Sequence, residues 1–278
     1  MKARLLVAGI GIPLLLLILI WAPAWGTALL IAVLSVIGAH ELLCAVGGSE
    51  KARRWTILPA LMDIAVTFAV YMTDKTASPF YMTRWLWLGG CVVALFICMV
   101  LEFGKRKPMT FQDVAAILLS GIAIPLALCC LLRLRLLPYG GGFVLIPLVA
   151  AFCSDSAALF TGMACGKHKL APAVSPHKTV EGAVGGLVGG IVGMIFFRII
   201  FYFCTVYPLS IGLCILLGFV GSAMGQLGDL SFSAIKREFG IKDYGKLLPG
   251  HGGVLDRFDC VIFAAPVIWL LLDFVFEV

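Results

Sequence analysis

Charged residues are scarce in this chain of 278 residues. Asp, Glu, Lys and Arg together make up 13% of it, whereas hydrophobic residues make up 62%. Soluble globular domains contain roughly 25% charged and 45–50% apolar residues. This deficit excludes a soluble enzyme and indicates a protein whose outer faces are solvated by lipid. The chain also lacks a polar stretch long enough for a separate soluble domain, so we expect one continuous membrane domain.

Common metal and redox motifs are missing as well. The ten cysteines show no C-x-x-C spacing, which excludes the usual zinc and dithiol arrangements. His40-Glu41 begins like the zinc-protease motif H-E-x-x-H, but Cys44 stands where the second histidine is required. The 21 Lys and Arg residues are scattered between apolar stretches without an aromatic-rich basic module. We therefore expect no nucleic acid as a partner, despite the net charge of +6.

What the sequence does contain is a series of apolar stretches, separated by Gly, Pro and charge clusters. Each is close to the ~20 residues that cross a bilayer as a helix. We predict an all-α polytopic membrane protein with about nine transmembrane helices, over 5–22, 27–46, 56–73, 85–101, 111–132, 143–165, 181–203, 210–228 and 259–276. The region 1–140 carries little beyond the apolar pattern, so we place the catalytic region in 141–278.

The distribution of basic residues predicts the orientation. If the N-terminus is cytoplasmic, most Lys and Arg residues fall on the cytoplasmic side, as the positive-inside rule requires, and the C-terminus is outside. The two longest cytoplasmic segments are then 166–180 and 229–258, so we expect the chemistry to face the cytoplasm. Ala22-Pro23-Ala24 resembles a signal-peptidase site, but another apolar span follows at once and we expect no cleavage.

Asp155 lies in a predicted span, where the free energy of placing a carboxylate in the membrane is high. It lies between two serines near the middle of span 143–165, where an Asp costs about 2.5–3.5 kcal/mol unless it faces a polar cavity or partner. A hydrogen bond to a neighbouring helix is one explanation, and a substrate or ion site is the other. We favour the site. Asp63 raises the same question, and the sequence does not decide it.

The loop that precedes span 181–203 is suited to a phosphate. A helix start offers free backbone N–H groups, and Lys167 and Lys178 add full positive charges. A second interpretation explains the same residues without a ligand. In it Ser175 or Thr179 caps the helix, Glu181 occupies its first turn, and Lys167 is an interfacial anchor.

Glycines recur at three- and four-residue spacing in spans 181–203 and 210–228. Small residues at this spacing allow helix backbones to approach closely. We therefore predict that these two spans form a close-packed pair.

The segment from Gly225 to Asp259 is the richest in functional side chains. If the helix continues past Asp229, Ser233 and then Lys236 or Arg237 follow on the same face. Carboxylates combined with several cations suit a Mg²⁺-assisted reaction of a phosphorylated substrate.

Two explanations of the acidic residues in this segment are open. An acid-rich metal site accounts for Asp229 and Asp256 together. In the other explanation, Asp256 and Asp259 are helix caps and the basic residues form an interfacial belt. His251, with glycines on both sides, is better explained as a phosphate contact or a loop-fixing hydrogen bond than as a general base.

This segment closely resembles the signature of phosphatidate cytidylyltransferases, also called CDP-diacylglycerol synthases. The matching elements are Ser233, Lys236-Arg237, Lys242-Asp243, Pro249, His251-Gly252-Gly253, Asp256-Arg257 and Asp259. Upstream, Asp155, Gly162, Gly166-Lys167 and the run from Ser175 to Gly182 resemble other shared blocks of the family. The resemblance covers about 150–262, and His177 and Met163 stand where the family usually has lysine and arginine.

The resemblance implies transfer of a cytidylyl group from CTP to phosphatidate, which gives CDP-diacylglycerol and pyrophosphate. It further implies a divalent metal, usually Mg²⁺, and a homodimer in the cell inner membrane. The implied catalytic residues are Asp229, Asp256, Lys236, Arg237, Lys242 and Arg257, with Asp229, Asp256 and Asp259 as metal ligands. The implied substrate-binding residues are Lys167, Ser175, Lys178, Ser233, His251, Gly252, Gly253 and Asp155.

Two alternatives to this function are kept. A nucleotidyltransferase that acts on another lipid phosphate would carry the same motifs. A membrane transporter would also suit an intramembrane Asp155 and glycine-rich helices, although no internal repeat is visible.

Overall fold

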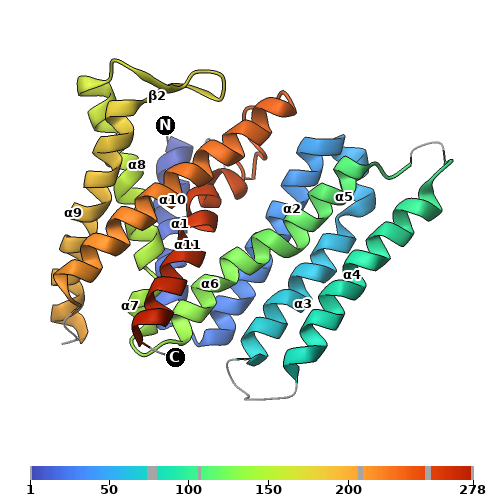
Figure 1. Cartoon of the computed structure of the whole chain (residues 1–278), viewed down its shortest axis with the longest axis horizontal. Helices are drawn as coiled ribbons and strands as arrows, with labels where there is room; N and C mark the ends of the chain where they lie inside the picture. Colours follow the sequence, from blue (N-terminus) through green and yellow to red (C-terminus); the bar gives the residue numbers. More distant parts are fainter. Residues whose placement is uncertain (1, 74–79, 106–107, 206–208, 248–251, 277–278) are drawn as a thin grey trace.

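The computed structural model describes residues 2–73, 80–105, 108–205, 209–247 and 252–276 (Figure 1). Almost all of them are helical. The elements are α1 (Lys2–Trp21), α2 (Ala24–Trp55), α3 (Ile57–Thr73), α4 (Phe80–Glu102), α5 (Phe111–Leu118), the π-helical segment η1 (Leu119–Ala123), α6 (Ile124–Leu136), α7 (Gly140–Phe143), α8 (Ile146–Cys165), β1 (Lys169–Ala171), β2 (Ser175–Thr179), α9 (Val180–Thr205), α10 (Ile211–Glu238) and α11 (Leu255–Phe276).

Six helical stretches within the described residues are long and apolar enough to cross a membrane. They are 22 to 32 residues long and comprise Ala24–Trp55, Phe111–Leu136, Gly140–Cys165, Val180–Thr205, Ile211–Glu238 and Leu255–Phe276. The other three predicted spans coincide with shorter apolar helices at Gly9–Trp21, Ile57–Met72 and Leu88–Glu102. The structure is therefore that of a helical membrane protein, whereas nine spans and a cytoplasmic N-terminus stay predictions.

The strictly all-α prediction is wrong in one place, because β1 and β2 form an antiparallel hairpin. Pro172 follows β1 in a tight turn that the Val174 N–H closes on the Ala171 carbonyl at 3.1 Å. Proline favours this turn position because its ring presets φ. Pro176, within β2, further disfavours a helix because it has no N–H to donate.

Helix α10 continues to Glu238, beyond the predicted end of span 210–228. Phe232 and Ile235 extend the apolar face of α10 beyond the predicted end of the span, and Phe232 is buried. Asp229 and Ser233 therefore lie one helical turn apart on the same face, as the conditional prediction required.

Glycines allow α9 to lie close to helices on both sides. A methyl group at Gly189 would overlap Ala157 of α8, and one at Gly190 would overlap Ser222 of α10. Gly218 of α10 meets the backbone of α9 at the same level. The predicted close packing of the two glycine-rich helices is confirmed, and α8 joins them as a third member.

Helices α2, α3, α5 and α6 of the N-terminal half pack in one hydrophobic cluster, which also includes residues of α8, α10 and α11. Near its end α2 is kinked at Gly48 (φ 76°, ψ 171°). Beyond the kink, Lys51 bonds Asp113 of α5 at 2.9 Å, and Arg54 pairs with Glu102 of α4. Helices α6 and α11 contribute residues to both hydrophobic clusters, so they join this half to the C-terminal bundle.

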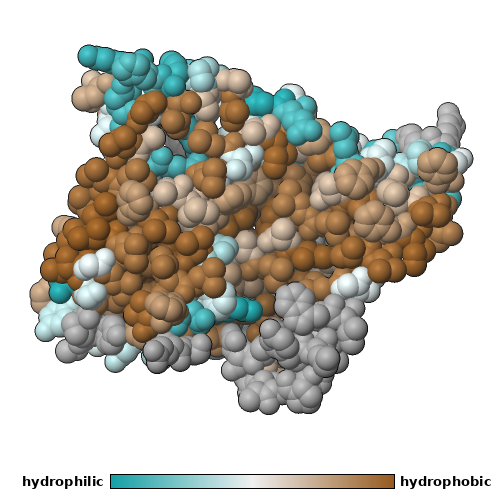
Figure 2. All heavy atoms as spheres, viewed as in Figure 1, coloured by the Kyte–Doolittle hydropathy of each residue, from teal (hydrophilic) through white to brown (hydrophobic). Residues whose placement is uncertain are grey.

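Apolar side chains cover most of the visible surface as a broad band (Figure 2). Hydrophilic residues gather along one edge, over the hairpin and the neighbouring helix ends, and more sparsely at the opposite edge. Helix α1 begins on the hairpin side and α11 ends on the opposite side (Figure 1). This distribution matches a protein embedded in a bilayer with the hairpin at one interface.

Candidate active site

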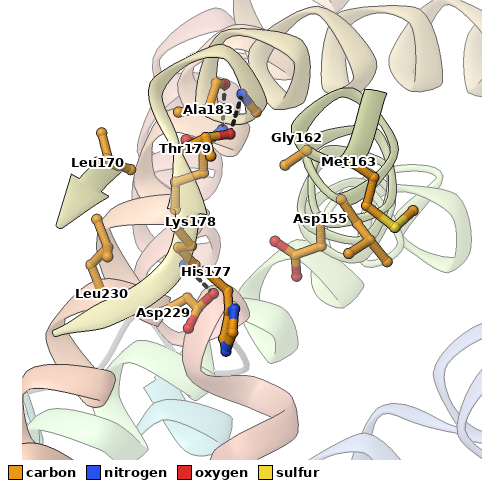
Figure 3. A pocket seen from close by; sticks show the side chains of 14 residues that line it. Asp155, Gly162, Met163, Leu170, His177, Lys178, Thr179, Ala183, Asp229 and Leu230 are labelled. Carbon is orange, nitrogen blue, oxygen red and sulfur yellow. Dashed lines mark hydrogen bonds and ion pairs between the residues drawn. The ribbon is translucent and has the colours of Figure 1, made fainter. Parts of the chain in front are cut away.

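A cavity of about 590 Å³ lies at the hairpin end of the C-terminal bundle (Figure 3). Side chains from α8, the hairpin, α9 and α10 line it. They are Asp155, Ala158, Leu159, Gly162, Met163, Leu170, His177, Lys178, Thr179, Gly182, Ala183, Gln226, Asp229 and Leu230. The cavity thus combines two carboxylates, a lysine and a histidine with an apolar wall.

Asp229 and Lys178 form the polar centre of this cavity. The Lys178 ammonium, on β2, makes an ion pair with the Asp229 carboxylate, on α10 (Figure 3). The Ser233 hydroxyl, one turn further along α10, donates to the second oxygen of Asp229 at 3.2 Å. The two charged side chains remain 29% and 27% exposed, so a ligand in the cavity can reach both.

Three carboxylates are close enough at this end of the bundle to repel one another. Asp155 of α8 and Asp259 of α11 each interact unfavourably with the charge of Asp229, and with each other. Asp259 is buried, whereas Asp155 lines the cavity. Lys178 and Lys236 compensate part of this negative charge. The charge of Arg257 also compensates that of Asp155. A cation bound beside these acids would further reduce their mutual repulsion.

Asp256 accepts three hydrogen bonds from the described residues. The Lys236 ammonium donates to one of its oxygens at 2.9 Å, and the backbone N–H groups of Tyr244 and Gly253 donate to the other, both at 2.9 Å. The Asp256 side chain is 4% exposed and does not line the cavity. These bonds support the alternative in which Asp256 fixes the start of α11. The carboxylates that line the cavity are those of Asp155 and Asp229.

Tyr244 belongs to the same buried network. Burial, together with the neighbouring charges of Asp256 and Asp259, raises the pKa of Tyr244. Its hydroxyl therefore stays protonated and donates to the Phe232 carbonyl at 2.9 Å. This bond fastens the loop after α10 onto the helix.

The start of α9 agrees in part with the interpretation in which these residues cap the helix and bind no ligand. The Thr179 hydroxyl accepts the Gly182 N–H at 3.1 Å, which makes Thr179 a capping residue. Glu181 accepts the backbone N–H groups of Lys167 and His168 at 3.1 and 3.2 Å. Ser175, at the start of β2, is not among the residues that line the cavity.

The remaining predicted residues that the structure describes are not among those that line the cavity. Arg237 is exposed, and its Nε donates to the Val174 carbonyl at the hairpin turn, at 3.1 Å. Lys167, Lys242 and Arg257 are exposed, and the charge of Arg257 acts on Asp155. Gly252 and Gly253 precede α11, with Gly252 at φ +85°. His251 lies outside the described residues.

Sequence reasoning missed Gln226. Its amide donates to the Ser154 hydroxyl at 3.2 Å and to the Ala183 carbonyl at 3.0 Å, so it joins α8, α9 and α10 beside the cavity. It stands three residues before Asp229, which places both on one face of α10. That helical spacing was the available signal.

These residues fit Mg²⁺ if substrate phosphates and water supply part of its ligands. No group of three or more His, Cys, Asp or Glu side chains among the described residues is arranged to hold a metal ion by itself. Mg²⁺ is commonly held through one or two carboxylates together with substrate phosphates and water. Asp229, open to the cavity and repelled by Asp155 and Asp259, suits such a shared site.

Comparison with known proteins agrees with these features. The phosphatidate cytidylyltransferases of Staphylococcus haemolyticus and Staphylococcus aureus are 31% and 32% identical to this chain, over 98% of it and 99% of each relative. The protein of the same name from Bacillus subtilis is 36% identical over 60% of this chain and 61% of its own length. A model of the Cytidylyltransferase family matches residues 2–275. The resemblance seen in the sequence is thereby confirmed, and the chain belongs to the cytidylyltransferase family.

Proposed function

We propose that this protein transfers the cytidylyl group of CTP to phosphatidate, giving CDP-diacylglycerol and pyrophosphate. The names of relatives that align over nearly the full length support the activity. The observation that carries the site is the cavity in which Asp229 and Lys178 meet beside Asp155.

In this reaction a phosphate oxygen of phosphatidate attacks the α-phosphorus of CTP. The new P–O bond forms as the bond to the β-phosphate breaks, and the electron pair leaves with pyrophosphate. Alignment and charge neutralisation therefore matter more than proton transfer. Lys178 would leave Asp229 and bind a phosphate of CTP. Further candidate phosphate contacts are Lys167, Lys242, Arg237 and Arg257.

Asp229 is our principal candidate for a Mg²⁺ ligand, with Asp259 and Asp155 adding negative potential. When bound, Mg²⁺ would supply positive charge that offsets the negative charge developing on the leaving group. The hydrogen bond from the Ser233 hydroxyl would hold the Asp229 carboxylate in position to bind the ion.

The cavity also suits two substrates of different polarity. Its wall on α8 carries Leu159 and Met163, which are 60% and 68% exposed, opposite Lys178 and Asp229. We infer that the acyl chains of phosphatidate remain in lipid beside this apolar wall. CTP would enter from the hairpin side, which we assign to the cytoplasm.

The test uses the purified full-length protein in detergent with labelled CTP, phosphatidate and Mg²⁺. Wild type should form a labelled CDP-lipid and release pyrophosphate. Asp229→Asn should lose about 100-fold or more in turnover, because a preorganised charge is removed from the reacting phosphates. Asp273→Asn, near the far end of α11, is the matched control and should retain activity.

Two outcomes would count against the proposal. A wild-type protein that makes no CDP-lipid would refute the activity, and full activity in Asp229→Asn would refute the site. Parallel assays with other lipid phosphates decide between phosphatidate and a different acceptor.

A further inference from the structure

Glu41 is a buried acid that the proposed reaction does not use. It lies within α2, in the N-terminal half, and is 5% exposed. One carboxylate oxygen accepts the Val254 N–H and the other accepts the Leu255 N–H, both at 3.0 Å. Glu41 is thus bonded to residues more than 200 positions away in the sequence.

These two N–H groups belong to the start of α11. The first N–H groups of a helix have no partner within the helix and need an outside acceptor. Val254 and Leu255 are 5% and 2% exposed, so water has little access to them, and neither side chain can accept a hydrogen bond. The Glu41 carboxylate satisfies both groups, and its charge suits the positive end of the helix dipole.

Gly253 and Gly245 accommodate the same carboxylate. A methyl group at Gly253 would lie 2.5 Å from each Glu41 oxygen, and one at Gly245 would overlap the carboxylate. The sequence suggests that Gly253 lets backbone approach a ligand. In the structure the group that requires this space is Glu41.

The position of α11 matters to the site because two of its acids belong to the surrounding network. Asp256 bonds Lys236 of α10, and Asp259 interacts with Asp229. A shift at the start of α11 therefore moves both acids relative to α10. Glu41 lies on α2, so this contact couples the position of the start of α11 to the N-terminal half.

We propose that Glu41 is a positioning residue, which holds the start of α11 and the adjoining Gly253 so that the acids of α11 face α10 correctly. This inference rests on the proposed function for its kinetic effect. It extends that function by giving the N-terminal helices a part in catalysis.

The first experiment compares Glu41→Gln with wild type and with Glu238→Gln, an exposed glutamate at the end of α10. Glutamine keeps one acceptor oxygen but loses the second acceptor and the charge. We expect kcat to fall about tenfold or more, because small misplacements of reacting groups are costly, while KM for phosphatidate changes less than twofold. Glu238→Gln should match wild type.

A second readout does not depend on activity. Trypsin cuts after exposed Lys242 and Lys246, in the loop whose Tyr244 N–H donates to Asp256 of α11. Glu41→Gln should speed cleavage at these lysines several-fold and leave cleavage at Lys169, on the hairpin, unchanged. Unchanged cleavage together with unchanged kcat would overturn the proposal. If the wild type is inactive, the proposed function fails, while the cleavage comparison still tests the positioning role.

A third comparison decides what Gly253 is for. Gly253→Ala should reduce activity strongly in the wild-type background, because the new methyl group meets Glu41. In a Glu41→Ala background the same change should cost less than about twofold, since the two sites share one contact. If the losses instead multiply, Gly253 serves a ligand and the proposed link to Glu41 is wrong.

Discussion

At the scale of single residues, the two lysine–aspartate pairs of the C-terminal half differ in burial and therefore in role. The Lys178–Asp229 pair lines the cavity and is partly exposed, whereas the Lys236–Asp256 side chains are 11% and 4% exposed. Exposed pairs contribute little to stability, but removing one partner of a buried pair leaves an uncompensated charge. We therefore propose that the first pair is available for substrate and that the second mainly stabilises the structure.

Asp256→Asn tests this division. We expect the loss of the charge partner of Lys236 to destabilise the protein by about 3–5 kcal/mol. Thermal unfolding in detergent measures the effect, with Lys246→Met as a control for an exposed lysine of the same loop. If Asp256→Asn keeps wild-type stability but needs more Mg²⁺ for activity, Asp256 is a metal ligand, as the resemblance implies, and our interpretation of the geometry is wrong.

Lys178→Met should give the opposite pattern. Its pair with Asp229 is partly solvated, so we expect less than about 1 kcal/mol of lost stability. The catalytic efficiency with CTP should fall about 10- to 100-fold, because a charge facing the phosphates is removed. Lys169→Met, an exposed lysine on the same hairpin, is the control. Equal kinetics in the two variants would remove Lys178 from the site.

At the scale of elements, the glycine rows determine how closely α8, α9 and α10 approach. Gly190 has no room for a methyl group against Ser222, and the Gly218 carbonyl would be only 3.0 Å from it. Because the cavity is built from side chains of these same helices, their spacing also sets its width. Packing and function are therefore linked through small residues.

Gly190→Ala should destabilise the protein by about 1–3 kcal/mol through overpacking. Gly212→Ala, near the start of α10, has no atom within 4 Å of the added methyl group and should be nearly neutral. Adding Ser222→Gly to Gly190→Ala should restore part of the lost stability. If Gly190→Ala is as stable as Gly212→Ala, α9 and α10 do not pack closely enough at Gly190 to exclude a methyl group.

At the scale of the whole molecule, the end of α4 and the start of α5 lie on the same side as the hairpin (Figure 1). Both form ion pairs with α2, and residues of the hairpin line the cavity. We assign this side to the cytoplasm from the distribution of Lys and Arg. Two exposed native cysteines mark the two sides. Cys165 ends α8 beside the hairpin, and Cys204 lies near the opposite end of α9.

Labelling with a membrane-impermeant maleimide tests the orientation. In variants that keep only one of these cysteines, Cys165 should react in inverted vesicles and Cys204 in intact spheroplasts. Detergent-solubilised protein provides the total labelling for each variant. The reverse pattern would place the cavity outside the cell and contradict the assignment.

Sequence patterns predicted the features of this protein that depend on local chemistry. The apolar stretches indicated membrane helices because hydropathy is a property of each segment by itself. Helical spacing placed Asp229 and Ser233 on one face, and glycine spacing predicted the close approach of α9 and α10. The hairpin at Pro172 was missed because a short polar loop carries no periodic signal that distinguishes a turn from a hairpin.

The resemblance and the residue types also predicted the family from the sequence alone. What only the tertiary structure decided is which acids face one another. Asp229 and Asp256 are both carboxylates and therefore both possible metal ligands. In the structure Asp256 bonds Lys236 and the backbone N–H of Tyr244. Asp229 instead interacts with Asp155 of another helix. Glu41 lacked any local signal, because its partners Val254 and Leu255 are brought to it only when α11 packs against α2. Such contacts depend on the mutual positions of whole helices, which no spacing within one segment encodes.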